Sequence, residues 1–116
     1  MRVKLPETLR ITPYTYRVVP VTKLLNTDHC RMYGECDTAN LEIRLDDGNN
    51  DQHMRQTLLH EVLHAISNHA TLGIEEDTIE RLANGMLAFL TDNGWLREDV
   101  LAADPDDFPV AHVRFE

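Results

Sequence analysis

One long helix is predicted by residues 51–70, whose sequence is DQHMRQTLLHEVLHAISNHA. Apolar residues recur along it at the spacing of an amphipathic helix, at Met54, Leu58, Leu59, Val62, Leu63, Ala65 and Ile66. Asn50 or Asp51 can cap its N-terminus, and Gly73 can serve the break at its C-terminus. A second helical stripe covers residues 75–92. Because the connection between the helices is short, we expect them to pack as an antiparallel pair.

Two extended segments precede these helices. Residues 9–21, LRITPYTYRVVPV, are rich in β-branched and aromatic side chains and predict one strand, with Pro13 and Pro20 at its ends. Residues 40–45, NLEIRL, alternate apolar with polar side chains and predict a second, half-buried strand. This order of elements indicates an α+β fold, with a small, mostly antiparallel sheet packed on two antiparallel helices. We assign the domain to residues 1–94 and treat 95–116 as an acidic C-terminal tail, in which a short strand is expected near Phe108–Phe115.

Composition narrows the classes of protein that fit this chain. Its 116 residues contain 20 acidic and 11 basic side chains, for a formal charge of −9. Such a field repels nucleic acids and anionic membranes, so neither is expected as a partner. No apolar run is long enough to cross a bilayer, and the first residues lack the apolar core of a secretory signal. Two cysteines make no disulfide framework. We therefore expect a cytoplasmic protein.

The long helix contains the motif His-Glu-x-x-His at residues 60–64. Residues four apart lie on one helical face, so the imidazoles of His60 and His64 can bind a single metal ion. Glu61 is rotated by about 100° around the helix and can act as general base toward a water molecule that the metal activates. A metal-assisted hydrolase requires this division of roles. The alternative is a pair of solvated surface histidines, which the flanking apolar residues disfavour.

A catalytic zinc site needs a third protein ligand and an open position for water. The second helix offers Glu76 and Glu80. If the chain reverses at residue 72, beside Gly73, then Glu80 lies level with His64. Glu76 then lies about 6 Å nearer the loop. We therefore expect Glu80 to be the third ligand, with Glu76 as the alternative.

These two helices resemble a known family. TLLHEVLHAI at 57–66, followed by IERLAN at 79–84, is similar to the small zincin-type metallopeptidases of phage and prophage genomes. It is also similar to the ImmA/IrrE metallopeptidases, in which a ligand glutamate follows the zinc helix in an E-x-x-A-N context. The extended segments 14–19 and 34–45 resemble the strands that precede the zinc helix in the small phage proteins.

The resemblance implies a zinc-dependent metallopeptidase with a minimal zincin-like fold. Zn²⁺ would be held by His60, His64 and Glu80, and Glu61 would be the catalytic base. A phage-encoded chain would act in the cytoplasm of its host. A strand edge at residues 40–45 is expected to hold an extended peptide or protein substrate by β-addition.

Two other functions stay open. One is a metal-binding regulatory or interaction protein of phage or prophage origin without significant turnover. The other is an acidic module that binds partners through its charge. The sequence does not indicate an oligomeric state.

Further candidate residues follow from residue type alone. Zincins often add a tyrosine or histidine that stabilises the oxyanion, and Tyr33, His53 and His69 are of these types. Cys30 and Cys36 could form a second metal site, but their spacing is unusual for structural zinc. Two reduced thiols are the preferred interpretation.

Overall fold

The computed structural model describes residues 5–94, which form four strands followed by two helices. These elements are β1 (Thr8–Ile11), β2 (Tyr14–Val21), β3 (Gly34–Asp37), β4 (Glu42–Asp46), α1 (Asp51–His69) and α2 (Glu76–Asp92). The strands make one sheet in the order β1-β2-β4-β3, in which β2 and β4 run parallel and the other pairs antiparallel. The predicted α+β fold is confirmed. The strand expected near Phe108–Phe115 lies outside the described residues.

The strand predicted between Pro13 and Pro20, within residues 9–21, is confirmed as β2, but the separate strand β1 that precedes Pro13 was not predicted. This segment forms a hairpin in which Ile11 of β1 lies opposite Tyr14 of β2. The chain reverses at Thr12 and Pro13, which are joined by a cis peptide bond. Proline has no N–H to donate to a strand ladder, so it suits the reversal better than the strand interior.

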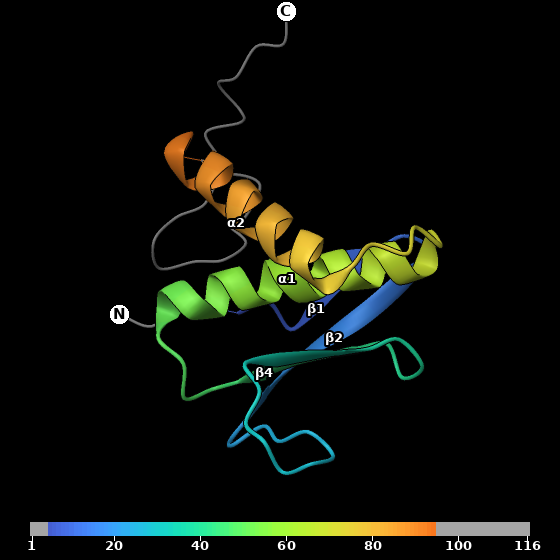
Figure 1. The fold of residues 1–116 in the computed structure, drawn as a ribbon, viewed down its shortest axis with the longest axis vertical. Helices are drawn as coiled ribbons and strands as arrows, with labels where there is room; N and C mark the ends of the chain where they lie inside the picture. The colour runs from blue at the N-terminus through green and yellow to red at the C-terminus, as the bar shows by residue number, and fades with distance from the viewer. Residues whose placement is uncertain (1–4, 95–116) are drawn as a thin grey trace, which may run out of the picture.

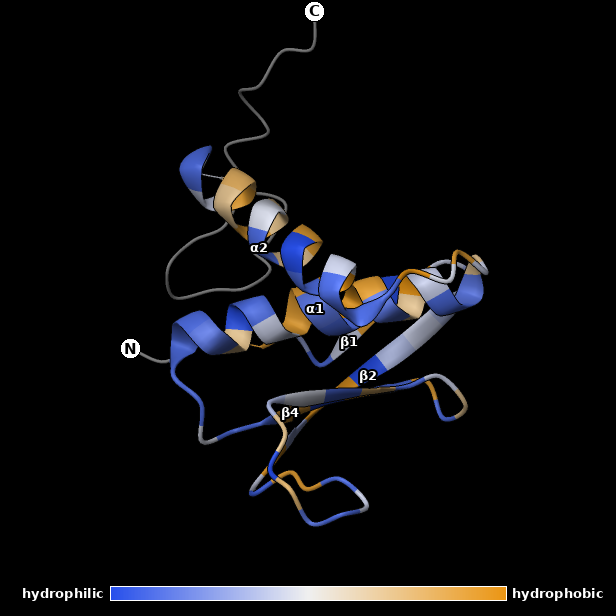
Figure 2. Cartoon of the chain, in the orientation of Figure 1, coloured by the Kyte–Doolittle hydropathy of each residue, from blue (hydrophilic) through white to orange (hydrophobic). Residues whose placement is uncertain are grey.

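The two helices form successive layers on one face of the sheet (Figure 1). α1 covers one face of the sheet, and the hydrophobic core lies between α1 and the sheet. Its buried members are Tyr16, Val18, Ile43 and Leu45 from the strands and Met54, Leu58 and Ala65 from α1. α2 packs on α1 through Ile79 and Ala83, which are fully buried. Because α2 buries only Ile79 and Ala83, its other apolar side chains Leu82, Met86 and Phe89 are exposed. Figure 2 shows hydrophobic segments recurring along α2.

Neither helix could span a membrane: within residues 5–94, none combines the necessary length with the necessary apolar character.

Asp46 anchors the turn that leads from β4 toward α1. Its carboxylate is 1% exposed and accepts hydrogen bonds from the Arg31 guanidinium at 2.9 and 3.1 Å. It also accepts from the backbone N–H groups of Leu24 and Gly48. The Arg31 guanidinium, with these backbone donors, lowers the pKa of Asp46 to about 2.

We expect Asp46→Ala to lower the free energy of unfolding by about 2 kcal/mol at pH 7, because it leaves charged and backbone donors without their acceptor. A carboxyl group whose pKa is lower in the folded state stabilises fully above its unfolded pKa, near 4, and loses this contribution as the pH falls toward 2. Urea unfolding should therefore show a difference between wild type and variant at pH 7 that shrinks at pH 2. The exposed Asp77→Ala is the control. A difference independent of pH would contradict the assignment.

Candidate metal centre

The boundaries of α1 follow from its local sequence. Asn50 caps the helix as predicted, since its Oδ1 accepts from the backbone N–H of His53 at 2.9 Å. At the other end α1 stops at His69, and Thr71 adopts the left-handed conformation with φ of 56°. The helix thus ends one residue before the predicted end at residue 70, and Gly73, expected to serve the break, is also left-handed with φ of 62°.

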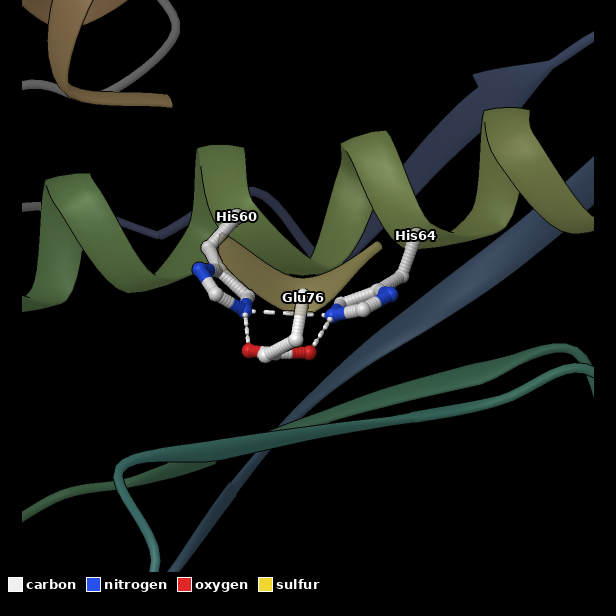
Figure 3. Close-up of side chains that lie close together, drawn as sticks. All are labelled: His60, His64 and Glu76. Atoms are coloured by element: carbon white, nitrogen blue, oxygen red, sulfur yellow. Dashed lines mark hydrogen bonds and ion pairs between the residues drawn. The ribbon is translucent and has the colours of Figure 1, made fainter. Parts of the chain in front are cut away.

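His60 and His64 leave α1 on the same side and meet at their Nε2 atoms, which are 3.1 Å apart (Figure 3). The carboxylate of Glu76, from the first turn of α2, bridges the two rings. Its Oε1 lies 2.6 Å from Nε2 of His60, and its Oε2 lies 2.6 Å from Nε2 of His64. One ligand atom from each of the three residues lies within 4.8 Å of the others.

Glu80, one turn further along α2, contacts the other ring nitrogen of His60. Its Oε2 lies 2.7 Å from Nδ1, and its Oε1 accepts a hydrogen bond from Nε2 of Gln56 at 3.0 Å. A carboxylate at Nδ1 fixes the orientation of the ring, as the outer partners of metal-binding histidines do.

The expected register between the helices is wrong by one turn. Glu76 lies beside His64, whereas Glu80, expected at that level, lies beside His60. Both pairs are centred on residue 70, where α1 ends, and not on residue 72. The reason is that the chain leaves the helical path at Thr71, before it reaches the glycine.

His60, His64 and Glu76 could together hold a metal ion. Two imidazole nitrogens bound tetrahedrally to zinc at about 2.0–2.1 Å lie about 3.3 Å apart, close to the 3.1 Å between the Nε2 atoms of His60 and His64, whereas the Glu76 oxygens lie at the hydrogen-bonding distance of 2.6 Å from these atoms. Imidazole and carboxylate are the ligands that zinc takes in catalytic sites. Cys30 and Cys36 are free thiols and belong to no such group of three potential ligands among residues 5–94.

His60 and Glu76 of the cluster line a groove of about 740 Å³ between the two helices and the start of β3, whereas His64 lies outside its lining. The helices diverge toward the end of α2 (Figure 1), and the lining of the groove extends to Thr91 and Asp92 at that end. Tyr33 and His53 line it with their ring centroids 5.2 Å apart, so two of the three oxyanion candidates reach the groove. The third, His69, contacts Tyr14 and Tyr16 instead.

Glu61 lines the same groove and is only 7% exposed. Burial raises its pKa to about 7; the charge of Glu76 adds to the rise, and the charge of His60 opposes it. A carboxyl group with a pKa near neutrality is suited to accept and return a proton. Burial also raises the pKa of the Cys36 thiol to about 12, and the charge of Glu61 contributes to that shift. Glu61 therefore lies close to β3 as well as to the histidines.

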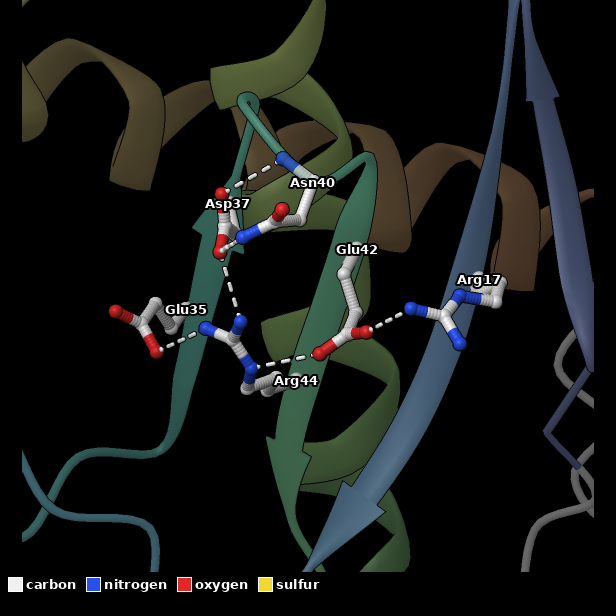
Figure 4. A network of polar contacts seen from close by, with 6 residues as sticks. All are labelled: Arg17, Glu35, Asp37, Asn40, Glu42 and Arg44. Carbon is white, nitrogen blue, oxygen red and sulfur yellow. Dashed lines mark hydrogen bonds and ion pairs between the residues drawn. The ribbon is translucent and has the colours of Figure 1, made fainter.

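An ion-pair network holds β3 in place beside the groove (Figure 4). On the face of the sheet opposite α1, the Arg44 guanidinium lies 2.7–2.8 Å from the carboxylates of Glu35, Asp37 and Glu42. Glu42 also pairs with Arg17 of β2. The network therefore ties β3 to β4 and β2 through side chains as well as backbone hydrogen bonds.

Two residues that shape the groove, Gly34 and Arg55, were not singled out by the sequence. Gly34 begins β3 where the strand passes against α1. A Cβ atom at this position would lie 2.5 Å from Cγ2 of Thr57 and 3.2 Å from Cδ2 of Leu45, both buried side chains. No local sequence pattern marks either residue, because the role of each depends on contacts with other elements of the fold.

We expect Gly34→Ala to lower the free energy of unfolding by about 1–3 kcal/mol, because the methyl group overpacks a buried contact. Thr57→Ser removes the Cγ2 methyl group, so the double variant should recover most of the loss. Urea unfolding of both single variants and the double variant measures this coupling. An unchanged unfolding midpoint for Gly34→Ala would show that the close approach does not constrain the strand.

No protein-family model, curated protein or solved structure matches the chain. The function is therefore inferred from the geometry of the groove and its histidine–glutamate cluster.

Proposed function

We propose that the protein is a zinc-dependent metallopeptidase. The observation that carries this proposal is the convergence of ligand atoms from His60, His64 and Glu76 beside a groove that His60, Glu76 and Glu61 line. The contacts favour Glu76 as the third ligand, in place of the expected Glu80. Glu80 would orient His60 through Nδ1.

The chain's own residues supply the proton transfers of peptide hydrolysis. Bound zinc contributes a Lewis acid that acidifies water and polarises the scissile carbonyl. Glu61 takes one proton from the attacking water as the water oxygen bonds to the carbonyl carbon. It then returns this proton to the amide nitrogen as the C–N bond breaks. One water molecule is consumed, and a carboxylic acid and an amine are released.

The sheet favours an extended peptide as substrate. β3 is an edge strand, and its outer side pairs with no other strand among residues 5–94. Its first residue, Gly34, and the preceding Tyr33 line the groove. A peptide that adds to this edge would therefore pass the histidines. The expected edge at residues 40–45 is wrong, because β4 is paired with β2 on one side and β3 on the other.

Cys30 and Cys36 are unpaired thiols. We propose a cytoplasmic location on this basis, since a reducing compartment keeps thiols free.

Metal content and peptide cleavage together test the proposed function. The purified full chain should bind about one zinc ion and cleave members of a quenched fluorescent peptide library. A chelator should remove the activity, and added zinc should restore it. Zinc binding without any cleavage would favour the regulatory or interaction protein. Absence of zinc binding would leave only the acidic binding module.

A further inference from the structure

Arg55 lies on α1, five residues before His60, and lines the same groove. Its side chain is half-buried, and its Nε atom is buried without a hydrogen-bond partner. Within residues 5–94 its guanidinium makes neither a hydrogen bond nor an ion pair. The other arginines of this range each contact a side-chain oxygen: Arg10, Arg17, Arg31, Arg44 and Arg81.

This arrangement is unfavourable in the free protein. A buried donor without an acceptor costs free energy, and native structures rarely keep one without a ligand or a bound water. A chain with 20 acidic and 11 basic residues offers many possible partners. The guanidinium of Arg55 is therefore available to a molecule that enters the groove.

Arg55 is also distinct in charge from its surroundings. Of the described residues that line the groove, it alone is an arginine or lysine, whereas four are acidic: Glu61, Glu76, Glu80 and Asp92. Glu76 and Glu80 already contact the histidines. Among the described residues, the lining of the groove thus contains one fixed cation, Arg55, and several carboxylates.

We propose that Arg55 binds a carboxylate of the peptide in the groove, which makes the site selective for acidic peptides. This inference rests on the proposed function. A planar guanidinium matches a carboxylate through two parallel hydrogen bonds. Arg55 lies about 7.5 Å along the helix axis from His60 and about 140° around it, so the carboxylate that it binds is at least two residues of an extended peptide away from the scissile bond. That carboxylate belongs to an acidic side chain or to the peptide C-terminus.

Peptide binding without turnover tests the proposal. Zinc-loaded Glu61→Gln protein is titrated with three labelled peptides: one with a glutamate and an amidated C-terminus, its glutamine counterpart, and the glutamine counterpart with a free C-terminus. We expect Arg55→Gln, made in the Glu61→Gln background, to weaken binding of one carboxylate peptide by roughly tenfold or more. It should change binding of the amidated glutamine peptide less than twofold. The peptide that responds identifies the source of the carboxylate, and Arg10→Gln is the matched control.

Unfolding of the free protein gives a second, independent measurement. Arg55→Met keeps the apolar stem and removes the unpaired donor, so its unfolding midpoint should equal or exceed that of wild type. A purely structural role for Arg55 would lower it. Equal loss of affinity for all three peptides, no loss for either carboxylate peptide, absence of peptide binding, or a lower midpoint would each overturn the proposal. These measurements use no turnover, so failure of the peptidase proposal is detected separately by the cleavage assay.

Discussion

Glu61→Gln is expected to abolish peptide hydrolysis while zinc stays bound. Glutamine has nearly the same shape, so it should fit the buried position, 7% exposed, that Glu61 occupies beside the histidines. It cannot take a proton from water. Loss of a general base typically lowers the rate by a factor of about 10²–10⁴, and we expect kcat/KM for a cleaved peptide to fall within this range.

Three measurements make this result interpretable. Zinc content should equal that of wild type, because Glu61 is not among the three clustered ligands. Glu35→Gln is the matched control, since Glu35 lies on β3 but pairs with Arg44 on the opposite face of the sheet. Retained hydrolysis in Glu61→Gln would exclude Glu61 as the base. Loss of zinc together with activity would assign Glu61 to the support of the ligands.

The helices and β4 could be predicted because their signals are local. The Asn50 cap and the apolar stripe lie within the helix segment that they define, and α1 ends within a residue of the predicted range 51–70. The alternation of Ile43 and Leu45 with polar neighbours similarly places β4. Each of these patterns reports which face of one element is buried, and the folded chain buries that face.

β3 and the hairpin could not be predicted in this way. β3 has the sequence Gly-Glu-Cys-Asp, which lacks both β-branched residues and an apolar alternation. It becomes a strand through its pairing with β4 and its contact with α1, which are tertiary effects that override propensity. Pro13 was expected at the start of a strand, but the four-residue β1 before it was not separated from that strand.

In the candidate site, too, the residues placed by one helix could be predicted, and the residue placed by the packing of two helices could not. The histidine pair and Glu61 depend only on positions within one helix, and the i, i+4 spacing is sufficient to bring His60 and His64 together. The third carboxylate depends on how two helices are set against each other. The connection between the helices contains two left-handed residues, Thr71 and Gly73, and only the glycine is of a type that predicts this conformation.

Glu76→Gln and Glu80→Gln are expected to weaken zinc binding to very different degrees. The two substitutions are chemically identical and lie one turn apart on α2. Glu76 reaches both Nε2 atoms, so its substitution replaces an ionised ligand by a neutral amide. The binding free energy of structural zinc sites with four ligands is roughly 10–16 kcal/mol. If one ligand contributes about a quarter of this free energy, its loss lowers the zinc affinity by more than about a hundredfold.

Glu80→Gln should have a much smaller effect. The glutamine carbonyl can still accept a hydrogen bond from Nδ1 of His60, so the ring keeps its orientation, and we expect a loss below about tenfold. Glu80→Ala removes that acceptor and should cost about 10–100-fold. Competition with a chelating dye measures all three affinities, with Glu75→Gln, just before α2, as the control. If Glu80→Gln proved the more damaging of the pair, Glu80 would be the ligand, and α2 would have to move along α1 by about one turn when zinc binds. The same experiment therefore identifies the third ligand and tests whether the helix register seen here is the one that holds the metal.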